Sequence, residues 1–557
     1  MTAIEVGRGR VPEATCPPTA ASTLVKSIAG HGVDRLFCVA GESYLAVLNE
    51  LFDVREIDVV TCRHEGSAAF MALADAKLTG RAGVCLVSRG PGITNAAIGI
   101  HAARQDATPL VVIAGTVATA DFGREVFQEL DCTAMFGDLV KACLVLHDPG
   151  RTGEFAARAF RAAESGTPGP VILAVPENVT RSPDPHGVPA GRWPEYSPGP
   201  PAQAVAAVTD LLSRSRRPLL IAGGRLASAA GRRALTAAAD AQVMPVVTSN
   251  KRQDLLDNRA PNYAGHVHNS TPAEQIAAFS DCDLVLAVGA RLDETTAGRL
   301  AFLNAPGSGR PLIHVYPDAG RIGVAHRPAV GLPCDPVAFL HAIAALPASH
   351  PRERQVWTGE LHRLEQAKAA WCPRPCTDGI VFGAVVSALD ELTGGDVTVV
   401  LDSGTFTSWV YRHLRLTGTG RMLGLSSSPM GFGVPGGVAA AQRIRNRPVV
   451  TVVGDGGFLM NGSELITAVT AGLPLVVIVA DNRSYGTIRA HQQRSYPGRT
   501  IATDLINPDF VRLAEAYGAL GIAVRTEAEV RSALRRAFTH DGPAVIHVPT
   551  SLECGRP

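Results

Sequence analysis

Short, uninterrupted runs of valine, isoleucine and leucine recur along this chain of 557 residues, separated by stretches long enough for a helix. Examples are PVILAVP at residues 170–176, DLVLAVGA at 283–290 and LPLVVIVADN at 473–482. A strand that is apolar at every position is buried on both faces, as in a parallel sheet covered by crossover helices. The pattern therefore predicts an α/β fold with doubly wound parallel sheets.

Two segments interrupt this pattern, one rich in proline and glycine at residues 176–203 and one rich in charge at 347–379. Both have the composition of linkers. They divide the chain into three domains of ordinary size, expected at residues 18–185, 200–348 and 375–557. In such domains ligands bind at the carboxyl ends of the strands, so functional residues are expected there.

Charge and composition exclude some classes of partner. Basic and acidic residues number 52 and 51, a net charge of +1, which argues against nucleic acid or an anionic membrane as a partner. No apolar run approaches the roughly 20 residues of a membrane span, and a cytoplasmic protein is expected. Cys372 and Cys376 resemble half of a zinc site, but no second pair follows nearby, so no metal is expected there.

Polar side chains follow two of the apolar runs near the C-terminal end. Asp455 ends one run, and Asn482 ends the next, 27 positions later (482 − 455). A carboxylate and an amide oxygen at one sheet edge suit Mg²⁺ that is shared with phosphate oxygens. Gly454, Gly456 and Gly457 would let backbone N–H groups approach an anion. An ordinary tight turn at Gly-Asp-Gly is the alternative.

This stretch resembles the cofactor-binding motif of thiamine diphosphate enzymes. The resemblance implies that Asp455, Asn482 and the main-chain carbonyl of Ser484 hold Mg²⁺ on the cofactor diphosphate. Asp481 stands where the family usually has asparagine. The further cofactor-binding residues implied in this stretch are Gly454, Gly456, Gly457, Tyr485, Gly486 and Thr487.

Other parts of the chain resemble the same family. Glu65, in RHEG, matches the glutamate that hydrogen-bonds the aminopyrimidine ring; in isolation it also suits the first turn of a helix. The cofactor itself supplies the electron sink. Met430, in SSSPMGFG, matches the residue that props the cofactor in its bent shape, although a lone methionine often only fills a gap. Gly404 and Thr405 match the loop that borders the diphosphate.

The closest likeness is to the acetohydroxyacid (acetolactate) synthase branch, through SRGPGITN at residues 88–95 and FQELD at 127–131. It implies three domains: pyrimidine-binding, central and diphosphate-binding. It also implies at least a homodimer, and commonly a homotetramer, because Glu65 and Asp455 of one site would come from different subunits. The polar residues expected near the reacting carbon are Glu42, His101, Gln128 and His491. For His101, a satisfied core histidine is the alternative.

Several departures from that branch fall on the acceptor side. Thr295 stands where the family has an arginine that binds a carboxylate. His491 stands in the place of a tryptophan, and Thr487 in that of a methionine. Residues 263–275 match the flavin contacts poorly, so FAD binding stays open.

The resemblance implies a carboligase of acetolactate synthase type, which decarboxylates a 2-oxo acid such as pyruvate and transfers the acyl unit to a second carbonyl. A decarboxylase or C–C lyase acting on another substrate is the alternative. A non-catalytic relative with a role in assembly or regulation is disfavoured by the presence of Glu65, Asp455 and Asn482.

Overall fold

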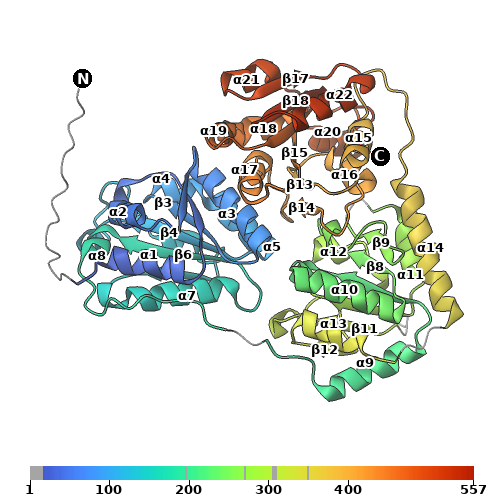
Figure 1. Cartoon of the computed structure of the whole chain (residues 1–557), viewed down its shortest axis with the longest axis horizontal. Helices are drawn as coiled ribbons and strands as arrows, with labels where there is room; N and C mark the ends of the chain where they lie inside the picture. Colours follow the sequence, from blue (N-terminus) through green and yellow to red (C-terminus); the bar gives the residue numbers. More distant parts are fainter. Residues whose placement is uncertain (1–16, 195–196, 269–270, 304–309, 348–350) are drawn as a thin grey trace, which may run out of the picture.

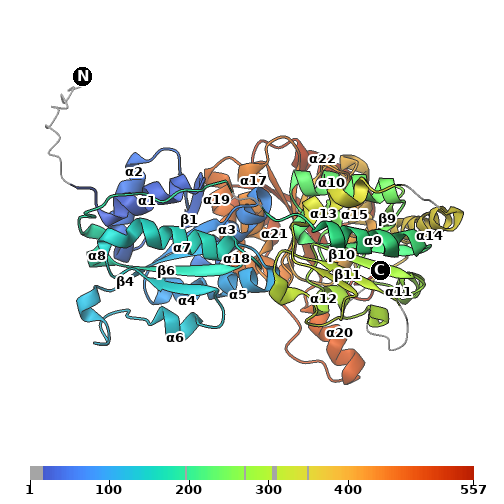
Figure 2. The same ribbon diagram turned by 90° about the horizontal axis from the view of Figure 1, so that it is seen from below.

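The computed structural model describes residues 17–194, 197–268, 271–303, 310–347 and 351–557. These residues form three parallel six-stranded sheets with helices packed along their faces (Figures 1 and 2). The predicted α/β fold with three doubly wound sheets is confirmed. Within the described residues, no helix has both the length and the apolar character needed to span a membrane.

The first sheet, close to the N-terminus, has a core of fully buried strands. Its order is β2 (Asp58–Thr61), β1 (Arg35–Cys38), β3 (Gly83–Val87), β4 (Leu110–Thr116), β6 (Pro170–Pro176) and β5 (Ala142–Val145). Its helices are α1 (Ala20–Gly30), α2 (Leu45–Asp53), α3 (Glu65–Thr79), α4 (Pro91–Asn95), α5 (Ala97–Asp106), α6 (Cys132–Phe136), α7 (Thr152–Glu164) and α8 (Glu177–Arg181). The small residues of α3 let this helix be buried along most of its length.

The central sheet has the order β12 (Val330–Leu332), β11 (Leu312–Val315), β10 (Leu284–Val288), β7 (Pro218–Ala222), β8 (Val246–Thr248) and β9 (Tyr263–His266). Its helices are α9 (Ala202–Arg214), α10 (Ala229–Gln242), α11 (Ala273–Ser280), α12 (Glu294–Ala297), α13 (Pro336–Ala344) and α14 (Arg352–Ala369). Much of the second expected linker is α14, which packs on this domain. Trp357 donates a hydrogen bond to the Pro218 carbonyl (2.9 Å), and buried Arg354 donates to three further carbonyls.

The third sheet repeats the strand order of the first. It runs β14 (Arg421–Leu423), β13 (Thr398–Leu401), β15 (Val449–Gly454), β16 (Leu475–Asp481), β18 (Ala544–Pro549) and β17 (Leu520–Ala523). Its helices are α15 (Phe382–Thr393), α16 (Thr407–His413), α17 (Gly433–Arg443), α18 (Asp455–Asn461), α19 (Leu465–Thr470), α20 (Gly486–Ser495), α21 (Phe510–Ala516) and α22 (Glu527–Phe538). Figure 2 shows α20 projecting away from the rest of this domain.

The first and third domains share one hydrophobic core, in which α3 packs against α17 (Figure 1). Phe70 meets Phe432 edge to face, with ring centroids 5.7 Å apart. Arg443 at the end of α17 forms ion pairs with Asp75 (2.5 Å) and Asp34 (2.6 Å) of the first domain. Asp75 lies on α3 and Asp34 directly precedes β1, so the guanidinium joins two separate parts of the first domain to the third.

Candidate functional site

Two neighbouring strand ends of the third sheet bring the predicted metal ligands to one edge. Strands β15 and β16 pair in register up to Gly454 and Ala480. Asp455 then begins α18, and Asn482 follows β16 directly. The two strands are therefore neighbours, as a site shared by Asp455 and Asn482 requires. Ser484, the third predicted ligand, is buried, and its hydroxyl has no hydrogen-bond partner.

A small hydrogen-bond network surrounds the Asp455 carboxylate. The amide of Asn507 donates to Asp455 Oδ2 and to Asp481 Oδ1, both at 2.8 Å. The other carboxylate oxygen of Asp481 lies 2.9 Å from His547 Nε2. Asp481, which departs from the usual asparagine, is thus held by a histidine. Sequence reasoning missed Asn507 and His547; a histidine inside the apolar run AVIHVP was the available signal for the second.

The two carboxylates of this network differ in their electrostatics. Burial raises the pKa of Asp455 to about 6. Burial also opposes ionisation of Asp481, but hydrogen bonds from His547, the Arg483 amide and Asn507 keep the pKa of Asp481 below its ordinary value. Asp455 therefore carries a buried charge whose side-chain partner is a neutral amide. That environment suits a divalent cation as the missing counter-charge.

Glycines bring the cofactor-binding candidates of the third domain together. A methyl group added at Gly456 would lie 2.7 Å from the Tyr485 ring and 3.3 Å from Met430 Cε. One added at Gly486 would lie 2.8 Å from Asn482 Nδ2. A larger residue at either position would therefore have to displace the neighbouring side chain. The residues present thus fit a diphosphate and its cation at this strand edge, with Met430 beside it.

The loop that carries Met430 is ordered by a buried carboxylate. Asp402 accepts hydrogen bonds from the backbone amides of Ser403 (2.7 Å), Gly431 (3.1 Å) and Gly433 (2.7 Å). Burial raises the pKa of Asp402 to about 6, although the hydrogen bonds from these backbone amides act in the opposite direction. The expected diphosphate-bordering residues Gly404 and Thr405 follow Asp402 at the end of β13.

A second group of predicted residues gathers at the first sheet. Glu65 begins α3, and its Oε2 accepts a hydrogen bond from Asn95 (2.9 Å). A methyl group added at Gly92 would lie 3.5 Å from Glu65 Oε1, and one added at Gly90 would lie 2.7 Å from the carbonyl oxygen of Gln128. Residues 88–95 therefore bring Glu65 and Gln128 to one side of this domain.

The other predicted residues near the reacting carbon lie on the surface of the chain. Glu42 is exposed, with a carboxylate oxygen 3.7 Å from Arg89. His101 on α5 is exposed, so its interpretation as a core histidine is wrong. His491, on projecting α20, is exposed and accepts a hydrogen bond from Arg494 (2.5 Å). Thr487 lies one turn earlier on the same helix and is half-buried.

Glu65 and Asp455 belong to separate surroundings. In the described part of the chain, the side-chain hydrogen bond of Glu65 is to Asn95 of its own domain. The contact of this helix start with the third domain is made by the Arg63 amide, which donates to Glu464 (3.2 Å). Within one chain, the side chains of Glu65 and Asp455 thus have different hydrogen-bond partners.

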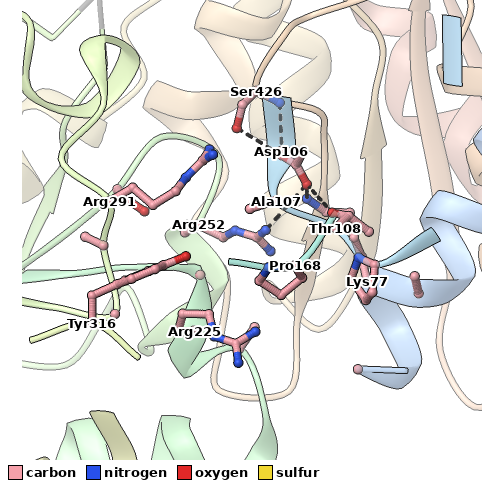
Figure 3. A pocket seen from close by; sticks show the side chains of 18 of the residues that line it. Lys77, Asp106, Ala107, Thr108, Pro168, Arg225, Arg252, Arg291, Tyr316 and Ser426 are labelled. Atoms are coloured by element: carbon pink, nitrogen blue, oxygen red, sulfur yellow. Dashed lines mark hydrogen bonds and ion pairs between the residues drawn. The ribbon is translucent and has the colours of Figure 1, made fainter. Parts of the chain in front are cut away.

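A cavity of about 280 Å³ opens where all three domains meet (Figure 3). The first domain contributes Lys77 and Asp106, the central domain contributes three arginines and Tyr316, and the third domain contributes Ser426. The arginines are Arg225, Arg252 and Arg291. Asn250, also in the lining, has a buried side-chain oxygen without a hydrogen-bond partner. The lining suits an anionic ligand.

Asp106 ties the three domains together at this cavity. Its carboxylate accepts hydrogen bonds from Lys77 Nζ (2.5 Å), the Ser426 backbone amide (3.0 Å) and the Ser426 hydroxyl (2.9 Å). It also lies 3.7 Å from the guanidinium of Arg252. Burial opposes ionisation, but the adjacent Lys77 and Arg252 hold the pKa of Asp106 below its ordinary value. Burial lowers the pKa of Lys77 to about 8.

Replacing Asp106 with asparagine is expected to destabilise the protein by about 3 kcal/mol, because the buried Lys77 and Arg252 charges lose their partner. Chemical denaturation of the full chain measures the change. Asp58→Asn breaks an exposed pair with Arg35 and serves as the control, with a loss below about 1 kcal/mol. Equal losses in the two variants would contradict a buried ion cluster at Asp106.

Comparison with known proteins identifies the fold and cofactor. Three domain models of the thiamine pyrophosphate enzymes match: the N-terminal TPP binding domain at residues 18–135, the central domain at 205–343, and the C-terminal TPP binding domain at 402–548. Each match falls on one of the three sheets, and the match at 205–343 contains every strand of the central one. The chain therefore belongs to the thiamine pyrophosphate enzyme family, and both its N-terminal and its C-terminal matches are to TPP binding domains.

The chain is similar along nearly its whole length to large subunits of acetolactate synthase. It is 31% identical to that of Parasynechococcus marenigrum (strain WH8102), over 96% of this chain and 88% of the relative. It is 29% identical to the isozyme 2 large subunit of Escherichia coli (strain K12), over 95% of each. A probable large subunit of Methanocaldococcus jannaschii is 28% identical, over 95% of this chain and 91% of the relative. These matches support an enzyme that forms carbon–carbon bonds.

Proposed function

We propose that this protein is a thiamine diphosphate- and Mg²⁺-dependent carboligase of acetolactate synthase type. It would decarboxylate a 2-oxo acid such as pyruvate and transfer the acyl unit to a second carbonyl. The observation that carries the proposal is the buried Asp455 carboxylate beside Asn482, in a chain similar throughout to acetolactate synthase large subunits. We also propose a cytoplasmic location.

The residues of the third domain would hold the cofactor by its diphosphate. Asp455, Asn482 and the Ser484 carbonyl would bind Mg²⁺, and the N–H groups at the start of α18 would face the phosphate oxygens. Met430, packed near Gly456, would support the bend between the two rings. When bound, the cofactor supplies the electron sink for decarboxylation.

Glu65 would hold and move a proton at the pyrimidine ring. Its Oε2 is held by Asn95, which leaves Oε1, on the side of Gly92, as the oxygen for proton exchange. Gln128, backed against Gly90, would face the reacting carbon from the same domain. His101 and Glu42 are exposed in one chain, so any contact with substrate requires a partner subunit or a bound ligand to cover them.

On the acceptor side of the proposed site, Thr295 stands where the resemblance places an arginine. Thr295 on α12 hydrogen-bonds Asp293 (2.8 Å), so its hydroxyl is committed within its own helix start. Thr487 and His491 lie together on α20. A smaller, more polar acceptor pocket follows, and we propose that the second carbonyl compound need not carry the carboxylate that an arginine would bind.

We propose at least a homodimer, with a homotetramer as the expected assembly. Glu65 and Asp455 have different neighbours in one chain, and each half needs the other for a complete site. Large apolar side chains are exposed on and after α20: Ile488, Tyr496, Ile501 and Ile506. A second copy of the chain that covers them would also close the site. Light scattering on the purified protein measures the assembly.

Product analysis tests the proposed reaction. Incubation with pyruvate, thiamine diphosphate and Mg²⁺ should release CO₂ and give an acetolactate- or acetoin-type product. Release of CO₂ with free acetaldehyde alone would support the decarboxylase instead. Absence of turnover across a panel of 2-oxo acids and aldehydes would favour the non-catalytic relative.

The cavity at the three-domain junction is the proposed place for a nucleotide such as FAD. The three arginines that the central domain contributes suit a diphosphate, and Asn250 offers an unpaired oxygen to a donor group. The absorbance spectrum of the purified protein distinguishes the ligands: a flavin band supports FAD, and an adenine band alone supports a nucleotide without flavin.

Uptake of Mg²⁺ is expected to weaken as the pH falls below about 6. The pKa of Asp455 is raised to about 6, so the carboxylate is ionised above that pH and protonated below it. A proton competes with the cation, and each further pH unit costs up to about tenfold in affinity. Titration with Mg²⁺ alone separates this effect from protonation of the cofactor phosphate. An affinity that does not change with pH would contradict Asp455 as the ligand.

A further inference from the structure

Two cysteines far apart in the sequence meet at the edge of the third domain. Cys376, near the end of the charge-rich segment 347–379, and Cys554, close to the last residues of the chain, have Sγ atoms 2.7 Å apart. A disulfide bond is about 2.05 Å long, so a small movement would join the two sulfurs. Both side chains are partly exposed, which admits a small oxidant. The second thiol is the partner that the sequence pattern around Cys376 lacked.

The tail is already docked where the thiols meet. The Asp378 carboxylate accepts hydrogen bonds from the Ser551 hydroxyl (2.5 Å) and from the backbone amides of Leu552 (2.8 Å) and Glu553 (2.9 Å). Burial opposes its ionisation, but these hydrogen bonds keep the pKa of Asp378 at about 2. The carboxylate therefore stays ionised at neutral pH and holds the two cysteines in one place.

The same tail borders the proposed cofactor site. A methyl group added at Gly486 would lie 3.4 Å from Leu552 Cδ1. One added at Gly555 would lie 3.7 Å from Thr405 Oγ1. The tail therefore lies next to both loops that were predicted to bind the diphosphate, one after β13 and one after β16.

We propose that Cys376 and Cys554 form a reversible disulfide that fixes the C-terminal tail against the cofactor loops when the protein meets a peroxide. One thiolate attacks the peroxide oxygen to give a sulfenic acid and water. The other thiol then displaces a second water to form the S–S bond, so two thiols and one hydrogen peroxide give a disulfide and two waters. In a reducing compartment such a bond is transient and regulatory.

A metal ion bound beside Cys376 is the alternative to a disulfide. Ligand atoms of Cys376, Asp378 and Glu553 lie within 4.8 Å of one another. However, both oxygens of Asp378 already accept hydrogen bonds from the tail. A cation would have to break those bonds, so the geometry favours the thiol pair.

Peptide mapping of the full-length protein tests the disulfide without reference to activity. After treatment with hydrogen peroxide and alkylation, a cross-linked peptide joining Cys376 and Cys554 is expected in the wild type and in the Cys372→Ser control. It should be absent from Cys376→Ser and Cys554→Ser, and dithiothreitol should reverse it. Oxidation of exposed Cys372 without this cross-link would overturn the proposal. So would zinc that co-purifies and protects both thiols until a chelator removes it.

The effect on the cofactor rests on the proposed function and has its own readout. Dissociation of thiamine diphosphate from the oxidised protein is expected to be about three- to tenfold slower than from the reduced protein, because the tail stays at high local concentration. Cys554→Ser should show no such difference, with an unchanged unfolding temperature as proof of folding. Equal dissociation rates in the wild type would overturn the tail latch. A protein that binds no cofactor would refute the proposed function, while the mapped disulfide would still be decided.

Discussion

Glu65→Gln is expected to lower turnover about 100- to 10,000-fold, the range of a lost general acid–base group. Glutamine keeps the size of the side chain and the hydrogen bond with Asn95, but it cannot exchange a proton. Steady-state kinetics with the preferred 2-oxo acid measure the loss. Thiamine diphosphate should still bind within about tenfold of the wild-type affinity, since the diphosphate half of the site is untouched.

The matched control for this variant is Glu56→Gln, which changes an exposed glutamate of the same domain. Its turnover should equal that of the wild type. A Glu65→Gln variant with full turnover would remove Glu65 from the proposed proton path. Loss of folding would be detected by the unfolding temperature, which should stay unchanged because Glu65 is only partly buried.

Asp455→Asn is expected to weaken Mg²⁺-dependent binding of thiamine diphosphate by roughly 1000-fold, since outer-shell partners of a metal alone cost 10- to 100-fold. The variant keeps the shape of the side chain and removes the buried charge. Calorimetric titration of the apo protein measures the affinity. Asp541→Asn, an exposed change in the same domain, is the control.

The stability of the metal-free Asp455→Asn variant distinguishes a ligand from a structural residue. Burial raises the pKa of Asp455 to about 6, above its unfolded value of 3.8. The folded state therefore binds more protons, and this group's ionisation lowers stability as the pH rises through that interval. Removing the charge should leave the metal-free protein as stable as the wild type or more so at pH 7. A marked loss of stability would indicate that Asp455 holds the fold rather than a cation.

Local patterns in the sequence predicted the sheets because a strand in a covered parallel sheet must be apolar at each position. LPLVVIVADN is such a run. It contains β16, and all residues of that strand are buried. Which strands pair does not follow from this rule. A site shared by Asp455 and Asn482 required β15 and β16 to be neighbours, and the structure pairs these two strands. The helical part of the second linker was also visible, but not its packing, which depends on Arg354 reaching carbonyls more than 100 positions away.

Long-range partners escaped the sequence because no local pattern encodes them. Asn507 comes from an irregular segment and bridges two carboxylates of different elements. Cys554 meets Cys376 across 178 positions. His101 shows the opposite failure: its apolar surroundings in the sequence suited a core residue, yet it lies on the outer face of α5. Residue-level roles in the cofactor site stay predictions for the variants above.

The core shared by α3 and α17 has a consequence for how the protein unfolds. One apolar cluster contains residues of both the first and the third domain, although each of these domains also has a cluster of its own. The clusters of the central domain contain no residue of the other two sheets. The first and third domains should therefore behave as one cooperative unit, although nearly 200 residues of another domain separate them along the chain. A destabilising substitution in either domain would therefore destabilise both halves of the cofactor site. During synthesis, the first domain reaches its final stability only after the strands of the third domain have been made.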